Sequence, residues 1–402
     1  MMQRRVKITG IGPVTPAGIG REEFWKGILE PVSRVRPYTK LGEEYGPLVA
    51  AYIDDHDLYR HIDRKIVPKG AARHTVFAVV GGMLALRDAG ISPGEFGAAR
   101  SAIVTGSSLM DFGGIGGSIE GVTKRGARVA QPRPLFTTGV GSVASAINTV
   151  LGAKSRLMSV STQCDSGMDA IGQAADLVAR GECDFAICGG TDAPLFRFPI
   201  LEMRVAGLTP ATDANPARIA RPFDRWRTTG VVSEGACMLL LEPDSSPRPA
   251  YAYIEGYAFA TDKGDDICGG MFDAAKLALA EAKMRACEVD AINAWGPGHK
   301  EVDVGEARAM VRLFGAGLAE IPAVSIKGAI GTALGGAPAI QVASAALALH
   351  DQIIPPTVNW DYPDPDCPLR LSNRASPVSH ERTLINAHGL GGVNAAMILR
   401  RC

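Results

Sequence analysis

Two successive halves of the chain carry the same alternation of short buried strands and helices. In the first half, apolar runs at 157–162 and 183–190 flank a helical pattern at 165–180. The alternation restarts after the proline-rich segment EPDSSPRPA at 242–250. Strands that are continuously apolar and alternate with helices are typical of sheets buried between helical layers. The chain is therefore expected to be an α/β protein built from two similar halves.

The boundary between the halves is expected in the proline-rich segment. This divides the 402-residue chain into an N-terminal half, 1–247, and a C-terminal half, 248–402. Such a length also exceeds what one small hydrophobic core supports. Further elements are expected as a helix at 71–90, a strand pair in YAYIEGYAFA (251–260), helices at 272–284, 303–314 and 337–350, and two strands within 384–399.

The composition argues against several classes of protein. The 42 basic and 42 acidic residues balance, so no basic field favours nucleic acid or an anionic membrane. No segment approaches a membrane span, and the opening MMQRRVKITGIG lacks the apolar core of a signal peptide. The eight cysteines show no C-x-x-C or His/Cys cluster that would indicate zinc. We expect a cytoplasmic protein with reduced thiols.

The segment VSTQCDSGMDAIG (160–172) places Cys164 at a strand-to-helix corner. The positive end of the following helix can lower the pKa of a thiol there. Asp165 is expected to cap that helix, and its negative charge would raise the thiol pKa. Such a corner suits a nucleophile, but it equally suits a small buried side chain. The choice depends on whether the chain supplies a base and an oxyanion site.

Five segments, in order, resemble the motifs of the β-ketoacyl-acyl-carrier-protein synthase family, the condensing enzymes of the thiolase fold. They are TGIGPVTPAG, VSTQCDSGMDAIG, RPFDRWRTTGVVSEGA, SIKGAIGTALGGAPA and NAHGLGGVNA. The resemblance spans essentially the whole chain. It implies a five-layered αβαβα sandwich that acts as a dimer.

The resemblance also implies a chemistry. In this family a cysteine takes an acyl group from a carrier thioester, and the carbanion left when a malonyl unit loses carbon dioxide attacks it. Cys164 would be the nucleophile, and the backbone N–H groups of Cys164 and Leu390 would hold the oxyanion. Substrates would arrive on the phosphopantetheine of an acyl carrier protein, and no metal or organic cofactor would be required. Two histidines would polarise the malonyl thioester carbonyl.

Both family histidines are replaced in this chain. Trp295 stands in place of the first, in NAWGPGHKEVD, and Thr332 in place of the second, in KGAIGT. Pro297 and His299 replace the threonines that would contact the pantetheine arm. An indole can only donate a hydrogen bond, so Trp295 is expected to fill the tunnel rather than to act as a base.

The polar residues behind the site are altered as well. Lys327 is kept, but Gln341 stands where the family has glutamate. Lys327 is therefore a catalytic candidate or, alternatively, pairs with a carboxylate such as Asp303 or Glu306. Gln163, beside the thiol, is expected to be a structural hydrogen-bonding group.

Two other histidines are candidates to replace the missing ones. His299 lies four residues after Trp295, and His388 lies two residues before Leu390. Neither occupies the position that the family's chemistry requires, and a misplacement of about 1 Å already impairs such steps. Rescue of condensation by either imidazole is therefore not the leading interpretation.

Loss of both histidines from an intact fold resembles the chain-length factors, the second subunits of type II polyketide synthase heterodimers. The segment 353–371 also resembles type II polyketide synthase subunits of both kinds. Chain-length factors usually carry glutamine where Cys164 stands here, so the retained thiol is a departure. The leading hypothesis is a non-condensing subunit that pairs with an active ketosynthase.

Two alternatives remain open. One is a cysteine-dependent acyltransferase or thioesterase-like enzyme that uses Cys164 with His388, and the other is an ordinary condensing enzyme. The partner subunit could also be a second copy of the chain. Side chains expected at the subunit boundary, or else in ordinary packing, come from the glycine-rich region 109–140: Met110, Phe112, Leu135 and Phe136.

Overall fold

The computed structural model describes residues 4–42, 46–210, 212 and 214–402. The first three residues of MMQRRVKITGIG thus lie outside the described residues. The strands are β1 (Val6–Thr15), β2 (Gly18–Ile19), β3 (Val35–Pro37), β4 (Val49–Ala51), β5 (Ser101–Gly106), β6 (Arg156–Val160), β7 (Phe185–Asp192), β8 (Gly235–Pro243), β9 (Ala252–Thr261), β10 (Ala291–Asn293), β11 (Ala323–Val324), β12 (Ile353–Ile354), β13 (Ser376–Pro377), β14 (Arg382–Gly389) and β15 (Val393–Arg401). The α-helices are α1 (Arg21–Leu29), α2 (Asp55–Leu58), α3 (Arg73–Asp88), α4 (Pro93–Ala98), α5 (Phe112–Arg125), α6 (Pro134–Thr137), α7 (Gly141–Leu151), α8 (Ser166–Ala179), α9 (Arg197–Val205), α10 (Gly269–Glu281), α11 (Lys300–Phe314), α12 (Lys327–Ile330) and α13 (Ala337–Asp351).

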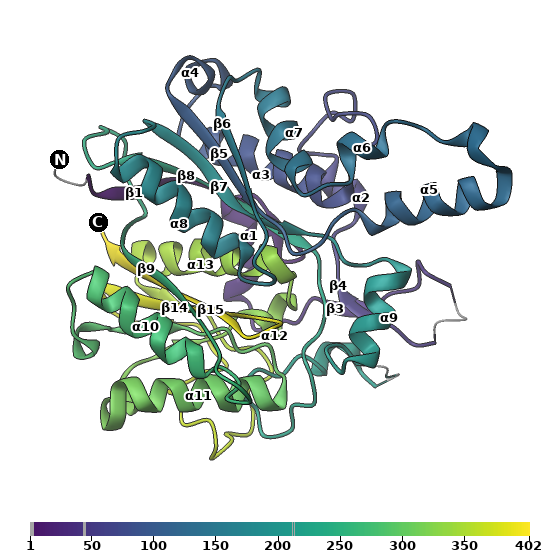
Figure 1. Cartoon of the computed structure of the whole chain (residues 1–402). Coiled ribbons are helices and arrows are strands. Elements are labelled where there is room, and N and C mark those ends of the chain that lie inside the picture. Colours follow the sequence, from purple (N-terminus) through teal and green to yellow (C-terminus); the bar gives the residue numbers. More distant parts are fainter. Residues whose placement is uncertain (1–3, 43–45, 211, 213) are drawn as a thin grey trace.

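The main strands form one hydrogen-bonded path that is folded into two sheets. Its order is β11-β10-β14-β15-β9-β1-β8-β7-β5-β6, with β2 added to β1. β1 pairs with β8 along most of its length but with β9 only through Val6–Ile8. Helices α8 and α13 lie between the two sheets, α3 and α7 cover one outer face, and α10 and α11 cover the other (Figure 1). This is the five-layered thiolase-like sandwich that the sequence predicts.

Small residues bring the two halves together at the centre of the molecule. Helix α13 is buried from Ala337 to Leu349, so its alanine-rich surface packs between sheets on both sides. A Cβ atom on Gly190 would lie 2.1 Å from the carbonyl oxygen of Gly335. Only glycine allows this approach. It places the end of β7 against the glycine motif of the second half.

Most predicted elements are confirmed, and the predicted strand pair is wrong. The helices predicted at 71–90, 165–180 and 337–350 are α3, α8 and α13. YAYIEGYAFA, however, belongs to the single strand β9, which pairs with β15 through one irregularity. A Cβ atom on Gly256 would lie 2.2 Å from the carbonyl oxygen of Ala278. This glycine therefore serves helix packing and not a turn.

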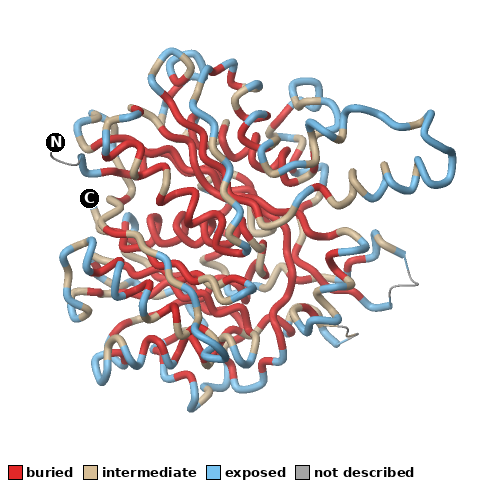
Figure 2. Tube along the Cα trace, viewed as in Figure 1, coloured by how far each residue is buried: buried red, intermediate tan, exposed pale blue. Residues whose placement is uncertain are grey.

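The segment 109–140 forms an exposed arm. Figure 1 shows α5 and α6 extending from the body of the molecule, and Figure 2 shows that this arm is largely exposed. None of the residues of α5 is buried. Among the helices of the described residues, none is both long and apolar enough to cross a bilayer.

Candidate functional site

Cys164 lies at the corner between β6 and α8. Gln163 before it has a φ of 54°, a left-handed conformation that costs a non-glycine residue on the order of 1 kcal/mol. The hydroxyl of Ser166 donates to the Gln163 carbonyl and accepts the Thr162 N–H at 2.9 Å. The corner is thus held by specific polar contacts, and Cys164 is 9% exposed.

The turn between β14 and β15 closes over this corner. A Cβ atom on Gly389 would lie 3.0 Å from the backbone nitrogen of Cys164, so the turn and the elbow are in close contact. The backbone N–H of Leu390 hydrogen-bonds the Cys164 sulfur. The structure therefore brings together the two residues assigned to the oxyanion site. The Leu390 side chain is half exposed, at the mouth of the site.

The thiol is protonated at neutral pH. Burial, followed by the nearby carboxyl groups of Asp165 and Asp192, raises the pKa of Cys164 to about 12. The Leu390 N–H opposes this shift but is outweighed. A nucleophilic role for Cys164 would therefore need a base at the moment of attack.

The prediction that Asp165 caps α8 is wrong. Its side chain makes no capping hydrogen bond, and both carboxyl oxygens are buried without a hydrogen-bond partner among the described residues. Burial, together with Asp169 and Asp262, raises the Asp165 pKa well above its ordinary value. Asp165 is therefore neutral over a wider pH range than an exposed aspartate. The full negative charge that the sequence suggested beside the thiol is absent below that raised pKa.

The backbone around Trp295 is fixed by one buried carboxylate. Glu306, on α11, accepts the N–H groups of Trp295 at 2.9 Å and Gly296 at 2.8 Å. It also accepts the side-chain amide of Asn386 at 2.9 Å. The hydroxyl of Ser325 donates to the Gly296 carbonyl at 2.7 Å. Trp295, which is 3% exposed, is thus part of a rigid wall.

Lys327 does not form the predicted ion pair with Asp303 or Glu306. Its Nζ donates to the amide oxygen of Gln341 at 2.8 Å and lies 4.0 Å from the centre of the Trp295 ring. Glu306 already accepts three N–H groups, which explains why it does not contact the ammonium. Burial lowers the Lys327 pKa, and the two carboxylates oppose this only at longer range.

A small apolar cavity connects most of the predicted site residues. Its volume is about 140 Å³. Lys327 is not in its lining and lies behind the Trp295 ring. The lining contains Cys164, Trp295, Pro297, His299, Thr332, His388 and Leu390.

The two candidate histidines differ in how they are held. His299 has a buried Nδ1 without a partner among the described residues, and burial lowers its pKa. His388, in contrast, shares a hydrogen bond of 2.9 Å between its Nδ1 and Oδ1 of Asn394. Asn394 in turn donates to Asp262 at 2.8 Å. Sequence reasoning did not find the last two residues, although Asn394 lies within the NAHGLGGVNA motif.

Asp192 is a further buried residue that the sequence did not single out. It accepts the N–H groups of Ser108 at 2.9 Å and Gly335 at 2.7 Å, and the hydroxyl of Ser107 at 2.8 Å. Burial raises its pKa to about 6. It ties the loop after β5 to the glycine motif of the second half, beside the thiol.

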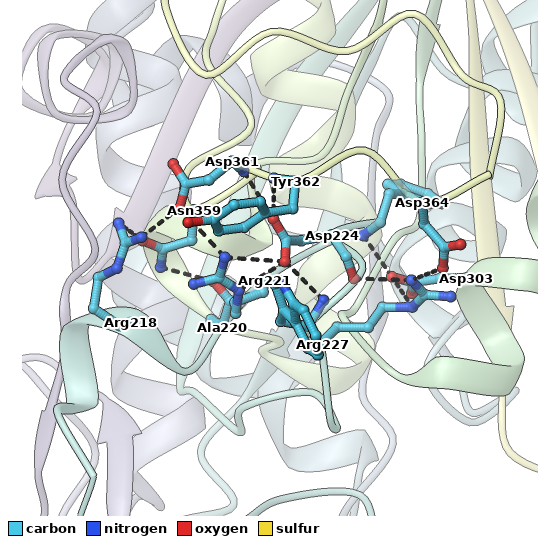
Figure 3. Close-up of polar contacts among 12 residues, drawn as sticks. Arg218, Ala220, Arg221, Asp224, Arg227, Asp303, Asn359, Asp361, Tyr362 and Asp364 are labelled. Atoms are coloured by element: carbon cyan, nitrogen blue, oxygen red, sulfur yellow. Dashed lines mark hydrogen bonds and ion pairs between the residues drawn. The ribbon is translucent and has the colours of Figure 1, made fainter. Parts of the chain in front are cut away.

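The motif RPFDRWRTTGVVSEGA is held to neighbouring segments by the hydrogen bonds and ion pairs drawn in Figure 3. Asp224 accepts the Arg221 guanidinium at 3.0 Å and the backbone N–H groups of Asp361 and Tyr362 at 2.8 Å each. Arg227 lies between Asp303 and Asp364. This network fastens the motif to the segment 353–371 and to α11, and so fixes the cavity wall at 230–232.

The site contains a thiol, a backbone N–H donor and two imidazoles around one cavity. In the described part of the chain, no group of three or more His, Cys, Asp or Glu side chains could hold a metal ion. The sandwich fold, with a cysteine elbow facing a glycine turn across the two halves, defines the condensing-enzyme class of the thiolase fold.

Comparison with known proteins gives the family. Residues 3–246 match the N-terminal domain of β-ketoacyl synthases, and residues 251–361 match the C-terminal domain. The chain belongs to the β-ketoacyl synthase family.

Similar proteins include polyketide β-ketoacyl synthases and 3-oxoacyl-[acyl-carrier-protein] synthases. A putative polyketide β-ketoacyl synthase 1 of Streptomyces virginiae is 34% identical, over 99% of this chain and 98% of that protein. A 3-oxoacyl-[acyl-carrier-protein] synthase 2 of Rhizobium meliloti (strain 1021) is 31% identical, over 99% of each chain. The solved ishigamide ketosynthase/chain length factor covers 100% of both chains with a TM-score of 0.90 and 28% identity. The protein is thus similar to type II ketosynthases and chain-length factors along its whole length.

Proposed function

We propose that this chain is a non-condensing, chain-length-factor-like subunit that pairs with an active ketosynthase and acts on acyl groups carried by an acyl carrier protein. The observation that carries the proposal is the wall formed by Trp295. A rigidly held indole occupies the position that the resemblance gives to the first histidine, where it stacks on Lys327 and borders a cavity of about 140 Å³. Ligand pockets commonly measure about 300–1,000 Å³. Little room is left for a malonyl group beside a thiol that already carries an acyl group.

The second histidine position supports the same interpretation. The Thr332 hydroxyl is buried and has no hydrogen-bond partner among the described residues. A hydroxyl of ordinary pKa does not accept a proton at neutral pH, and the Trp295 indole has no acceptor at all. Decarboxylation of malonyl thioesters therefore lacks its usual two imidazoles.

The surface proposed for the partner is the face made by β6, α5 and α6. β6 ends the sheet order, and Leu157 on it is exposed. Leu135 and Phe136, on α6, are 83% and 75% exposed. Met110 is exposed and Phe112 half-buried in the same arm. An unpaired sheet edge beside exposed apolar side chains favours association with a second chain. The solved relative named as a ketosynthase/chain length factor supports a ketosynthase as that chain.

The proposal is tested by assaying the purified chain for condensation of acyl- and malonyl-loaded acyl carrier protein, beside Cys164→Ala. The expected result is no β-ketoacyl product from either protein. Product formed by the wild type and lost in Cys164→Ala would refute a non-condensing role.

A further inference from the structure

The amide of Asn394 fixes the tautomer of His388. Its nitrogen donates to Asp262 at 2.8 Å and to the Gly392 carbonyl at 3.0 Å. Turning the amide over would place its oxygen against those two acceptors. The amide oxygen therefore faces His388, and because it can only accept, the proton of the neutral imidazole lies on Nδ1.

The other imidazole nitrogen is consequently free to act as a base. His388 Nε2 carries the lone pair in this tautomer, and it has no hydrogen-bond partner in the described chain. His388 lines the same cavity as Cys164. The Leu390 N–H, two residues further along the same turn, contacts the Cys164 sulfur. A thiol, a base and an oxyanion donor thus meet at one cavity.

Asp262 makes this arrangement rigid. Its carboxylate accepts the Asn394 amide at 2.8 Å and the backbone N–H groups of Cys268 at 3.0 Å and Gly270 at 2.9 Å. The order Cys164, His388, Asn394 and Asp262 is that of a nucleophile, a base and groups that orient the base. Nothing in it requires the positions occupied by Trp295 and Thr332.

We propose that Cys164 and His388 form a catalytic pair that cleaves short-chain acyl thioesters without decarboxylation, with Asn394 and Asp262 as positioning residues. This goes beyond the non-condensing role, which concerns the malonyl step only. A short aliphatic acyl group fits because the cavity is small and its lining includes Leu208, Val231 and Val302.

Groups at the site donate or accept the proton in each step of the proposed reaction. His388 Nε2 takes the thiol proton as the sulfur attacks the thioester carbonyl, and the oxyanion is held by the Leu390 N–H. The carrier sulfur then leaves as a thiol with that proton, and an acyl-cysteine remains. Water attacks this thioester while His388 takes its proton, which passes to the departing Cys164 sulfur. The products are a free acid and the carrier thiol.

The test uses the butyryl thioester of N-acetylcysteamine with the full chain, and measures intact mass and released thiol. The wild type is expected to gain a butyryl mass and release thiol. Cys164→Ala should do neither, and His388→Phe should release thiol about a hundredfold more slowly or worse, as general-base loss predicts. The matched control is His350→Ala, because His350 bonds Asp351 on the surface end of α13, outside the cavity.

The division of the effect between kcat and KM separates positioning from structure. Asn394→Ala removes the acceptor that holds the Nδ1 proton of His388, so Nε2 is no longer fixed in one tautomer and orientation. The kcat for thiol release should fall, while KM and the urea midpoint stay close to the wild-type values.

Either of two results overturns the proposal: a wild-type thiol that reacts with iodoacetamide but gains no butyryl group, or equal thiol release by wild type and His388→Phe. His388→Gln replaces His388→Phe if the latter does not fold, as judged by circular dichroism. Carbon–carbon bond formation is measured in neither assay, so failure here leaves the condensation test independent.

Discussion

At the scale of single residues, Gln341 gives Lys327 a neutral partner in a buried environment. The amide nitrogen of Gln341 is equally important, because it donates to Asn293 Oδ1 at 3.1 Å and to the carbonyls of Ala294 at 3.0 Å and Asn386 at 3.1 Å. A substitution by glutamate would remove this donor.

Gln341→Glu is therefore expected to destabilise the protein, although it places a negative charge beside Lys327. The new carboxylate would gain an attraction to Lys327 but would face the oxygens that the amide nitrogen now contacts, and an unsatisfied buried acceptor costs about 1–3 kcal/mol. Urea denaturation should show a lower midpoint than for the wild type. An unchanged or higher midpoint would show that the Lys327 attraction outweighs the lost donors.

At the scale of elements, the closing turn and the elbow make a close contact at the site. A Cβ atom on Gly389 would lie 3.0 Å from the Cys164 nitrogen and 2.7 Å from Cγ2 of Val393. Gly389→Ala is expected to push the turn outward, cost about 1–3 kcal/mol, and increase the rate at which iodoacetamide alkylates Cys164.

Gly116→Ala on α5 is the control, because a Cβ atom there meets nothing within 4 Å. It should leave alkylation unchanged. Equal alkylation rates in Gly389→Ala and the wild type would contradict the close contact.

Helix α3 contributes a pH dependence to stability. His74 on its first turn is 2% exposed, and burial lowers its pKa to about 4. In the unfolded chain His74 has an ordinary histidine pKa of about 6.5, so it binds a proton more readily there than in the folded protein. Its contribution to the free energy of unfolding is therefore complete above pH 6.5 and is lost as the pH falls toward 4. The shift corresponds to about 3 kcal/mol.

His74→Leu should therefore reduce the loss of unfolding free energy between pH 7 and pH 4 relative to the wild type, measured by urea titration. Parallel losses in the two proteins would contradict a neutral buried His74.

At the scale of the whole molecule, the exposed arm carries large apolar side chains that nothing in the described chain covers. Leu135→Asp with Phe136→Asp changes two exposed side chains, so the fold should tolerate it within about 0.5 kcal/mol. Sedimentation velocity of the chain mixed with an active type II ketosynthase should show a heterodimer for the wild type and separate subunits for this variant. Leu277→Asp, on the outer face of α10, is the control. Identical sedimentation of all three proteins would argue against the arm as the association surface.

The architecture could be predicted from the sequence because the spacing of apolar residues in buried strands and helices is regular. Helices α8 and α13, for example, lie where that spacing predicts them. It predicts the neighbours of Cys164 less well. Capping propensity suggested a hydrogen bond for Asp165, but the tight corner leaves that carboxyl buried and unpaired. The charge of Lys327 suggested a carboxylate partner, but Glu306 was already saturated by N–H groups.

Contacts between segments that lie far apart in the chain could not be predicted from the sequence. Asp262 and Asn394 come from different strand ends and meet only when β9 pairs with β15. A cavity of a given size likewise depends on how Trp295 packs, which no local pattern specifies.

The measurement that tests the central claim most directly is release of radiolabelled carbon dioxide from malonyl-loaded acyl carrier protein. It isolates the malonyl step that the proposed non-condensing role excludes, and it does not depend on acylation of Cys164. Release should be no faster from the wild type than from carrier protein incubated alone. Release that exceeds this background and scales with the concentration of the chain would contradict it.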